Sequence, residues 1–259
     1  MLFTKIYIKL FKFIINKISI SKKTIYLGTK YGGWHFLNNA NLENSLMVSA
    51  GVGEDISFDI EMINKYKINA VLIDPTPRAI EHIEKIIEAL GKSNTEEFLE
   101  GGNQPIEAYN LKNISEDDFT FIKKALFNKS NEIIKFFAPP NPNHVSHSIS
   151  NWQNNFSKNS NYIEVATLRM CDVTNLINNQ DINILKLDVE GAEIQVIPDL
   201  IKSNIFPNQI LVEFDELYKS SLIAYLKTTY IFIILFLKSY KTIDIDNFPN
   251  FLFVKKELI

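Results

Sequence analysis

The sequence has only one cysteine among its 259 residues, Cys171. A single cysteine excludes an intrachain disulfide and a zinc site built from several cysteines. This composition is typical of a reducing compartment, and we expect a cytoplasmic protein. The length suits one substantial α/β domain with decorations and is short for two domains.

The sequence also lacks a strong excess of charge of either sign. The formal net charge is −3, and acidic and basic residues are interspersed. Proteins that bind nucleic acids usually carry a basic patch or stripe. We therefore expect no nucleic-acid partner.

Long hydrophobic runs are missing as well. Residues 1–20 are apolar but interrupted by Lys5, Lys9 and Lys12, whereas a membrane-spanning helix needs about 20 largely uncharged residues. A signal peptide would need an unbroken apolar region, which is absent. The spacing predicts an amphipathic helix within residues 1–23. Two roles remain open: packing on the domain or on a partner subunit, which amphipathicity usually indicates, or peripheral contact with an anionic inner membrane surface through the lysine stripe.

The remaining chain divides into a short N-terminal unit and one large domain. Residues 24–45 are interpreted as a hairpin and linker, with strands at 24–28 and 34–37. Residues 46–259 form the predicted main domain. Within it, residues 91–165 are the least regular part, and we assign them to insertions that carry substrate loops.

The most informative stretch runs from Ser45 to Asp59. Leu46–Val48 predicts a buried strand, residues 49–53 a tight turn, and Asp55 onward a helix. A dinucleotide fingerprint would need a third glycine where Ile56 stands, and the P-loop pattern is absent. A turn with two glycines suits S-adenosylmethionine, which has no pyrophosphate to bind. The alternative is an ordinary strand–helix turn without a ligand.

Three predicted strands end in a carboxylate: 70–73 in Asp74, 184–187 in Asp188 and 209–212 in Glu213. If these strands are parallel, the three acids share one rim of the sheet, where an acid after the second strand binds ribose hydroxyls. Asp74 is also a candidate helix cap. Asp188 is a candidate proton acceptor or a ligand for a divalent cation. Carboxylates on this rim would also stabilise a sulfonium cation.

A proline-rich loop at residues 138–149 carries His144, Ser146 and His147. Loops on an α/β scaffold often meet the substrate, and a histidine there can act as a general base or bind the substrate. The H-x-x-H spacing alone is weak evidence for a metal, and we predict no metal ligands.

Several of these stretches resemble the FkbM-type methyltransferases. The matching pieces are residues 49–57, Asp74–Arg78, the Val-Ser-His-Ser loop, Leu185-Lys-Leu-Asp-Val-Glu-Gly-Ala-Glu193 and Ile210–Phe214. The resemblance covers roughly residues 45–215, and the Leu185–Glu193 motif is its most specific element. One departure is Ser49, because the family commonly opens the glycine turn with Asp.

The resemblance implies an α/β, Rossmann-like class I methyltransferase fold, in which a mixed seven-stranded sheet has helices on both faces and an antiparallel last strand. It also implies an S-adenosylmethionine-dependent O-methyltransferase whose acceptor is a saccharide or another small molecule. We assign the candidate roles as follows: Ser49, Gly51, Gly53 and Asp74 bind the cofactor, Asp188 and His147 are catalytic, and His144, Ser146, Glu190 and Glu213 bind the acceptor. Two alternatives stay open: a catalytically silent scaffold of a glycan assembly complex, and a metal-assisted methyltransferase.

Overall fold

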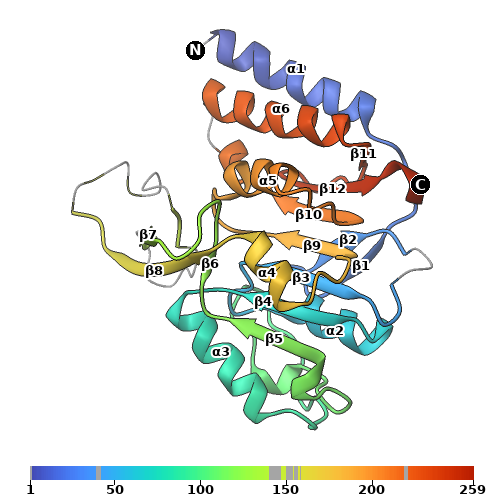
Figure 1. Cartoon of the computed structure of the whole chain (residues 1–259), viewed down its shortest axis with the longest axis vertical. Coiled ribbons are helices and arrows are strands. Elements are labelled where there is room, and N and C mark those ends of the chain that lie inside the picture. The colour runs from blue at the N-terminus through green and yellow to red at the C-terminus, as the bar shows by residue number, and fades with distance from the viewer. Residues whose placement is uncertain are drawn as a thin grey trace.

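The computed structural model describes residues 2–38, 42–139, 147–149, 154, 157, 159–218 and 221–259. At its centre is a seven-stranded sheet with the order β11-β12-β10-β9-β3-β4-β5 (Figure 1). Its strands are β3 (Leu46–Ala50), β4 (Asn69–Ile73), β5 (Phe119–Ile122), β9 (Ile184–Leu187), β10 (Gln209–Glu213), β11 (Tyr240–Ile243) and β12 (Asn250–Lys255).

The sheet is mixed, as expected. β3 pairs in parallel with β4 on one side and with β9 on the other. β4 pairs in parallel with β5, and β9 pairs in parallel with β10. The last strand, β12, is antiparallel to β10 and β11. β4, β9 and β10 therefore point the same way, and their carboxyl ends lie on one rim. The predicted strand ends at Asp74, Asp188 and Glu213 are confirmed.

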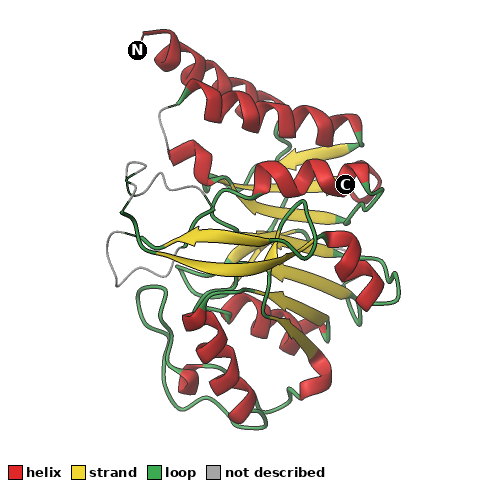
Figure 2. Ribbon diagram, turned by 60° about the vertical axis from the view of Figure 1, so that its left-hand side comes forward, coloured by secondary structure: helices red, strands yellow, loops and turns green. Residues whose placement is uncertain are grey.

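Helices cover both faces of the sheet, as Figure 2 shows from the side. α4 (Met170–Leu176), α5 (Glu193–Lys202) and α6 (Leu222–Leu237) pack with the sheet in one apolar core, and α2 (Ser57–Tyr66) and α3 (Pro77–Glu88) pack in the other. All five residues of β3 are buried, as expected for a central parallel strand covered on both sides. The predicted α/β fold class is confirmed.

The predicted N-terminal hairpin is also present. β1 (Ile25–Leu27) and β2 (Trp34–Phe36) pair antiparallel and lie on the α2 side of the sheet. Phe36 is fully buried and its ring meets Phe58 and Tyr66 edge-on. The side chain of Gln209 in β10 accepts from the backbone N–H of Leu37 and donates to its C=O, both at 2.8 Å. These two bonds anchor the hairpin to the sheet.

Residues 91–165 differ in part from the prediction. A second, three-stranded sheet with the order β6-β8-β7 stands beside the main one, formed by β6 (Ala125–Leu126), β7 (Ile133–Phe137) and β8 (Tyr162–Leu168). β5, however, is an edge strand of the main sheet rather than part of a substrate-loop insertion. β5, Phe-Thr-Phe-Ile, is apolar but only four residues long, and a run this short does not by itself identify a strand of the main sheet.

The predicted amphipathic helix is α1 (Leu2–Ile18), which packs on α6. Its Tyr7 hydroxyl lies 2.8 Å from the Thr229 hydroxyl of α6. The eight apolar residues 230–237 belong to α6, which is 16 residues long. Among the helices that the structure describes, none combines the length and apolar character that crossing a bilayer requires.

The anchor of the hairpin generates a stability prediction. Gln209→Leu leaves the buried N–H and C=O of Leu37 without partners, so we expect the free energy of unfolding to fall by about 2–4 kcal/mol. Gln180→Leu, at an exposed position, is the matched control and should change it by less than about 0.5 kcal/mol. Urea unfolding measures both. Equal effects of the two substitutions would contradict the anchoring role.

Candidate active site

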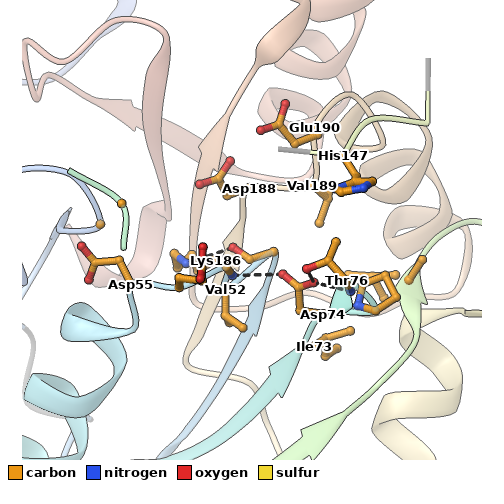
Figure 3. Close-up of a pocket in the computed structure, with 18 of the residues that line it drawn as sticks. Val52, Asp55, Ile73, Asp74, Thr76, His147, Lys186, Asp188, Val189 and Glu190 are labelled. Atoms are coloured by element: carbon orange, nitrogen blue, oxygen red, sulfur yellow. Dashed lines mark hydrogen bonds between the residues drawn. The ribbon is translucent and has the colours of Figure 1, made fainter. Parts of the chain in front are cut away.

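A pocket opens at the carboxyl ends of β3, β4 and β9 (Figure 3). Asp74, Asp188 and Glu190 lie around the same space in this view. The lining comes from the main sheet and its turns, from the β1–β2 hairpin and from β6 and β7: Tyr31, Gly32, Trp34, Gly51–Asp55, Ile73–Thr76, Gly102, Ala125, Leu126, Phe136, His147, Lys186 and Asp188–Glu190.

Residues 51–53 of the glycine turn line the pocket, and the two glycines have different structural roles. A Cβ on Gly51 would stand 1.7 Å from the carbonyl oxygen of Asp188, and φ is +76°. Gly51 is therefore required for the close contact between the ends of β3 and β9. A Cβ on Gly53 would meet no atom within 4 Å, and φ is +57°. Gly53 thus keeps space open beside the pocket as well as allowing the left-handed turn.

Asp74 ties the glycine turn to the start of α3. Its Oδ2 accepts from the backbone N–H of Gly53 at 3.0 Å, while its Oδ1 accepts from the backbone N–H and hydroxyl of Thr76 at 2.8 and 2.6 Å. Asp74 is therefore not the cap of α3: Thr76 is the N-cap residue, the helix has no side-chain cap among the described residues, and Asp74 forms a turn with Thr76 just before it. A carboxylate has about four acceptor positions, so one position on Oδ2 remains for a ligand hydroxyl.

The rim of the sheet brings together three acidic side chains, Asp188, Glu213 and Asp215. Burial raises the pKa of Asp188, and Asp74 adds to this rise whereas Lys186 opposes it. Burial and the nearby Asp188 raise the pKa of Glu213 to about 7, although Tyr218 donates to its Oε1 at 2.8 Å. Burial and four neighbouring carboxylates raise the pKa of Asp215 to about 11. Part of this acidic cluster is therefore protonated near neutrality.

A buried polar group lies beneath the glycine turn. Ser49 and Lys186 are register partners on β3 and β9, on the face toward α2, and both are buried. Asp59 of α2 is fully buried there, and neither it nor Ser49 has a hydrogen-bond partner within 3.5 Å among the described residues. Burial raises the pKa of Asp59, and Lys186 and Ser49 oppose the rise. Lys186 also donates to the carbonyl oxygen of Gly51 at 3.5 Å.

The pocket brings together most of the predicted site residues. Gly51, Gly53, Asp74, Asp188, His147 and Glu190 all line it. Ser49 does not, because its side chain points below the turn, and Glu213 lies behind the lining, where it interacts with Asp188 through its charge. His144 and Ser146 lie outside the described residues. The roles assigned to all of these residues stay predictions.

The loop that carries His147 is attached to the end of β9. The hydroxyl of Ser148 donates to the carbonyl oxygen of Glu190 at 2.7 Å, and Ser148 forms a bridge with Phe137 of β7. Glu190 adopts φ +52°, which turns the chain sharply after Asp188. Glu193 accepts from the backbone N–H groups of Val189 and Gly191, both at 3.0 Å. Glu193, the first residue of α5, therefore stabilises the turn that precedes its own helix.

Sequence reasoning missed one wall of the pocket, which the β1–β2 hairpin supplies through Tyr31, Gly32 and Trp34. Asp55 holds this wall in place, because its Oδ2 accepts from the Thr29 hydroxyl at 2.5 Å. A Cβ on Gly32 would lie 2.5 Å from the Asp55 carboxyl carbon. The adjacent glycines 32 and 33 beside a tryptophan were the available signal. They indicate a close backbone approach, but not what the hairpin approaches.

The pocket residues fit a cofactor of the S-adenosylmethionine type. The space next to Gly53 admits a ligand close to the backbone, Asp74 retains an acceptor position, and the carboxylates of Asp74 and Asp188 suit a sulfonium cation. Among the residues that the structure describes, no three His, Cys, Asp or Glu side chains gather in a way that could hold a metal ion.

The two glycines give a matched pair of substitutions. Gly51→Ala collides with the Asp188 carbonyl and should destabilise the protein by more than about 4 kcal/mol or prevent folding. Gly53→Ala meets no atom, so we expect a cost of about 1–2 kcal/mol from its positive φ. Thermal unfolding measures both. Similar losses of stability at the two positions would contradict the close contact at Gly51.

A model of the FkbM methyltransferase domain matches residues 23–241. The match is wider than the stretch on which the resemblance was based, and it includes the β1–β2 hairpin that forms one wall of the pocket. No curated protein and no solved structure matches the chain. Because the family model covers most of the sequence, the chain belongs to the FkbM methyltransferase family.

Proposed function

We propose that the protein transfers a methyl group from S-adenosylmethionine to a hydroxyl oxygen of a saccharide or a related small molecule. One observation carries the proposal: a glycine turn with open space at Gly53 lies in the same pocket as Asp74 and Asp188, at the carboxyl ends of parallel strands. Ligands of open α/β sheets bind at this edge.

Asp74 and the glycine turn would hold the cofactor. The free acceptor position on Asp74 would take a ribose hydroxyl, and the space at Gly53 would admit the methionine part. When bound, S-adenosylmethionine supplies a methyl group on positively charged sulfur. Negative charge at Asp74 and Asp188 favours that cation over the neutral S-adenosylhomocysteine.

Asp188 would accept the proton that the acceptor hydroxyl loses as its oxygen bonds to the methyl carbon. Its raised pKa makes the carboxylate a better base near neutral pH than an exposed aspartate. His147 lies near Val189 on the same side of the pocket and is the second candidate for this role (Figure 3). Much of the rate enhancement would come from holding the hydroxyl in line with the methyl carbon and sulfur.

The acceptor would enter beside Tyr31 and Glu190. Tyr31 is 60% exposed and Glu190 is partly exposed, and both line the pocket. An aromatic ring and a carboxylate near the opening offer a sugar ring both an apolar surface and a hydrogen-bond acceptor. The resemblance to enzymes that methylate glycan sugars and polyketide-type molecules supports this class of acceptor.

The first test separates cofactor binding from turnover. By isothermal titration we expect the protein to bind S-adenosylhomocysteine at about micromolar Kd and Asp74→Ala to weaken this binding at least about tenfold. Asp188→Asn should retain binding but lower methyl transfer to a panel of sugar acceptors by about 100-fold or more. Absence of binding by the folded wild-type protein would contradict the proposal, and binding without transfer to any acceptor would favour the silent scaffold.

The acidic cluster predicts a pH dependence that needs no acceptor. As the pH rises through about 7, Glu213 loses its proton and the rim becomes more negative. From about pH 6 to about pH 8, binding of S-adenosylmethionine should therefore strengthen several-fold relative to S-adenosylhomocysteine. Glu213→Gln should remove most of this change. Asp181→Asn, at an exposed position before β9, is the control, and an unchanged ratio in the wild type would be evidence against the electrostatic role.

A further inference from the structure

α1 and α6 form a separate helical layer at one end of the molecule, side by side in both ribbon views (Figures 1 and 2). Phe11 of α1 meets the rings of Tyr225 and Phe232 edge-on, with centroids 5.2 and 5.8 Å apart. Phe11, Tyr225 and Phe232 are buried. The inner side of this pair is thus a well-packed part of the main core.

The outer side of the same pair is also apolar. Twelve large apolar side chains of the two helices are between 37% and 72% exposed: Ile6, Leu10, Phe13, Ile14 and Ile18 of α1, and Leu222, Ile223, Leu226, Tyr230, Ile233, Phe236 and Leu237 of α6. We call this surface the α1–α6 face. In α6, positions 222, 226, 230, 233 and 237 form a continuous stripe along the helix. A groove between the helices continues the face, lined by Leu10, Ile14, Ile233 and Phe236 among others.

The charge on these helices has one sign. α1 contains four lysines and α6 contains one, and neither helix has an Asp or Glu. The exposed residues Lys9, Lys12 and Lys17 accompany the apolar surface on α1. Lys241 lies 4.8 Å from the ring centroid of Phe236. In a chain with formal net charge −3, two neighbouring helices whose charged residues are all lysines are a local exception.

The charge pattern distinguishes between occupants. A symmetric dimer through this face would bring the same lysines of two copies together, because a two-fold interface pairs each patch with itself. An anionic bilayer surface instead offers lipid tails to the apolar side chains and negative headgroups to the lysines. α1 and α6, at 17 and 16 residues, are suited to lying in the plane of the interface.

We propose that the α1–α6 face docks on an anionic membrane surface, with both helices parallel to the bilayer and their exposed apolar side chains inserted at the headgroup boundary. α6 is an integral helix of the domain, so docking through it would hold the whole catalytic domain, and not only a tail, at the membrane.

Sedimentation of the full chain with vesicles tests the proposal. We expect binding to phosphatidylcholine vesicles that contain about 30 mol % phosphatidylglycerol, at least about tenfold weaker binding to pure phosphatidylcholine, and loss of binding as salt increases. Leu226→Ser with Leu237→Ser should reduce binding to anionic vesicles about tenfold, and Lys9→Glu with Lys227→Glu should do so as well.

Matched controls remove the same kinds of side chain elsewhere. Leu99→Ser with Leu176→Ser replaces two leucines that are 59% and 66% exposed outside the face, and should leave vesicle binding unchanged. All variants alter exposed residues outside the pocket lining, so thermal unfolding should show that they are folded. No binding to anionic vesicles would overturn the proposal. A dimer in light scattering that only the leucine variants of the face dissociate would assign the face to a second copy instead and would equally overturn it.

Discussion

The contact between Gly51 and the carbonyl oxygen of Asp188 is the constraint on which the candidate site depends. It lets the chain after β3 touch the chain after β9, and no side chain larger than hydrogen fits between them. The same turn presents the N–H of Gly53 to Asp74. Two acids from strands on either side of β3 are thereby held at one pocket, where a cationic cofactor and a hydroxyl acceptor can meet.

Electrostatics around this contact explains why a lysine lies inside the fold. Lys186 is buried among Asp59, Asp188 and Glu213, and it lowers the pKa of each carboxyl against the rise that burial causes. A buried cation is stable only with such partners. Asp59 approaches from α2 toward Ser49, the position at which the family commonly has Asp.

The elements with strong local patterns were predictable, and those that depend on distant contacts were not. β3, β4, β9 and β10 are apolar runs that end in glycine or acid, so both the sheet rim and its acids follow from the sequence. β5 is only four residues long, too short to be recognised alone. The pocket wall at Tyr31 and Trp34 depends on Asp55 and Gln209, which lie far along the chain. The burial of Asp59 depends on Lys186 in the same way.

We propose that the cofactor occupies the space between Gly53, Asp74 and Asp188. A crystal structure of the protein with S-adenosylhomocysteine tests this claim most directly. We expect a ribose hydroxyl on Asp74, the methionine part beside Gly53 and the sulfur facing Asp188. A saturating ligand bound elsewhere, or a pocket that stays empty while the hairpin wall keeps its position, would contradict it.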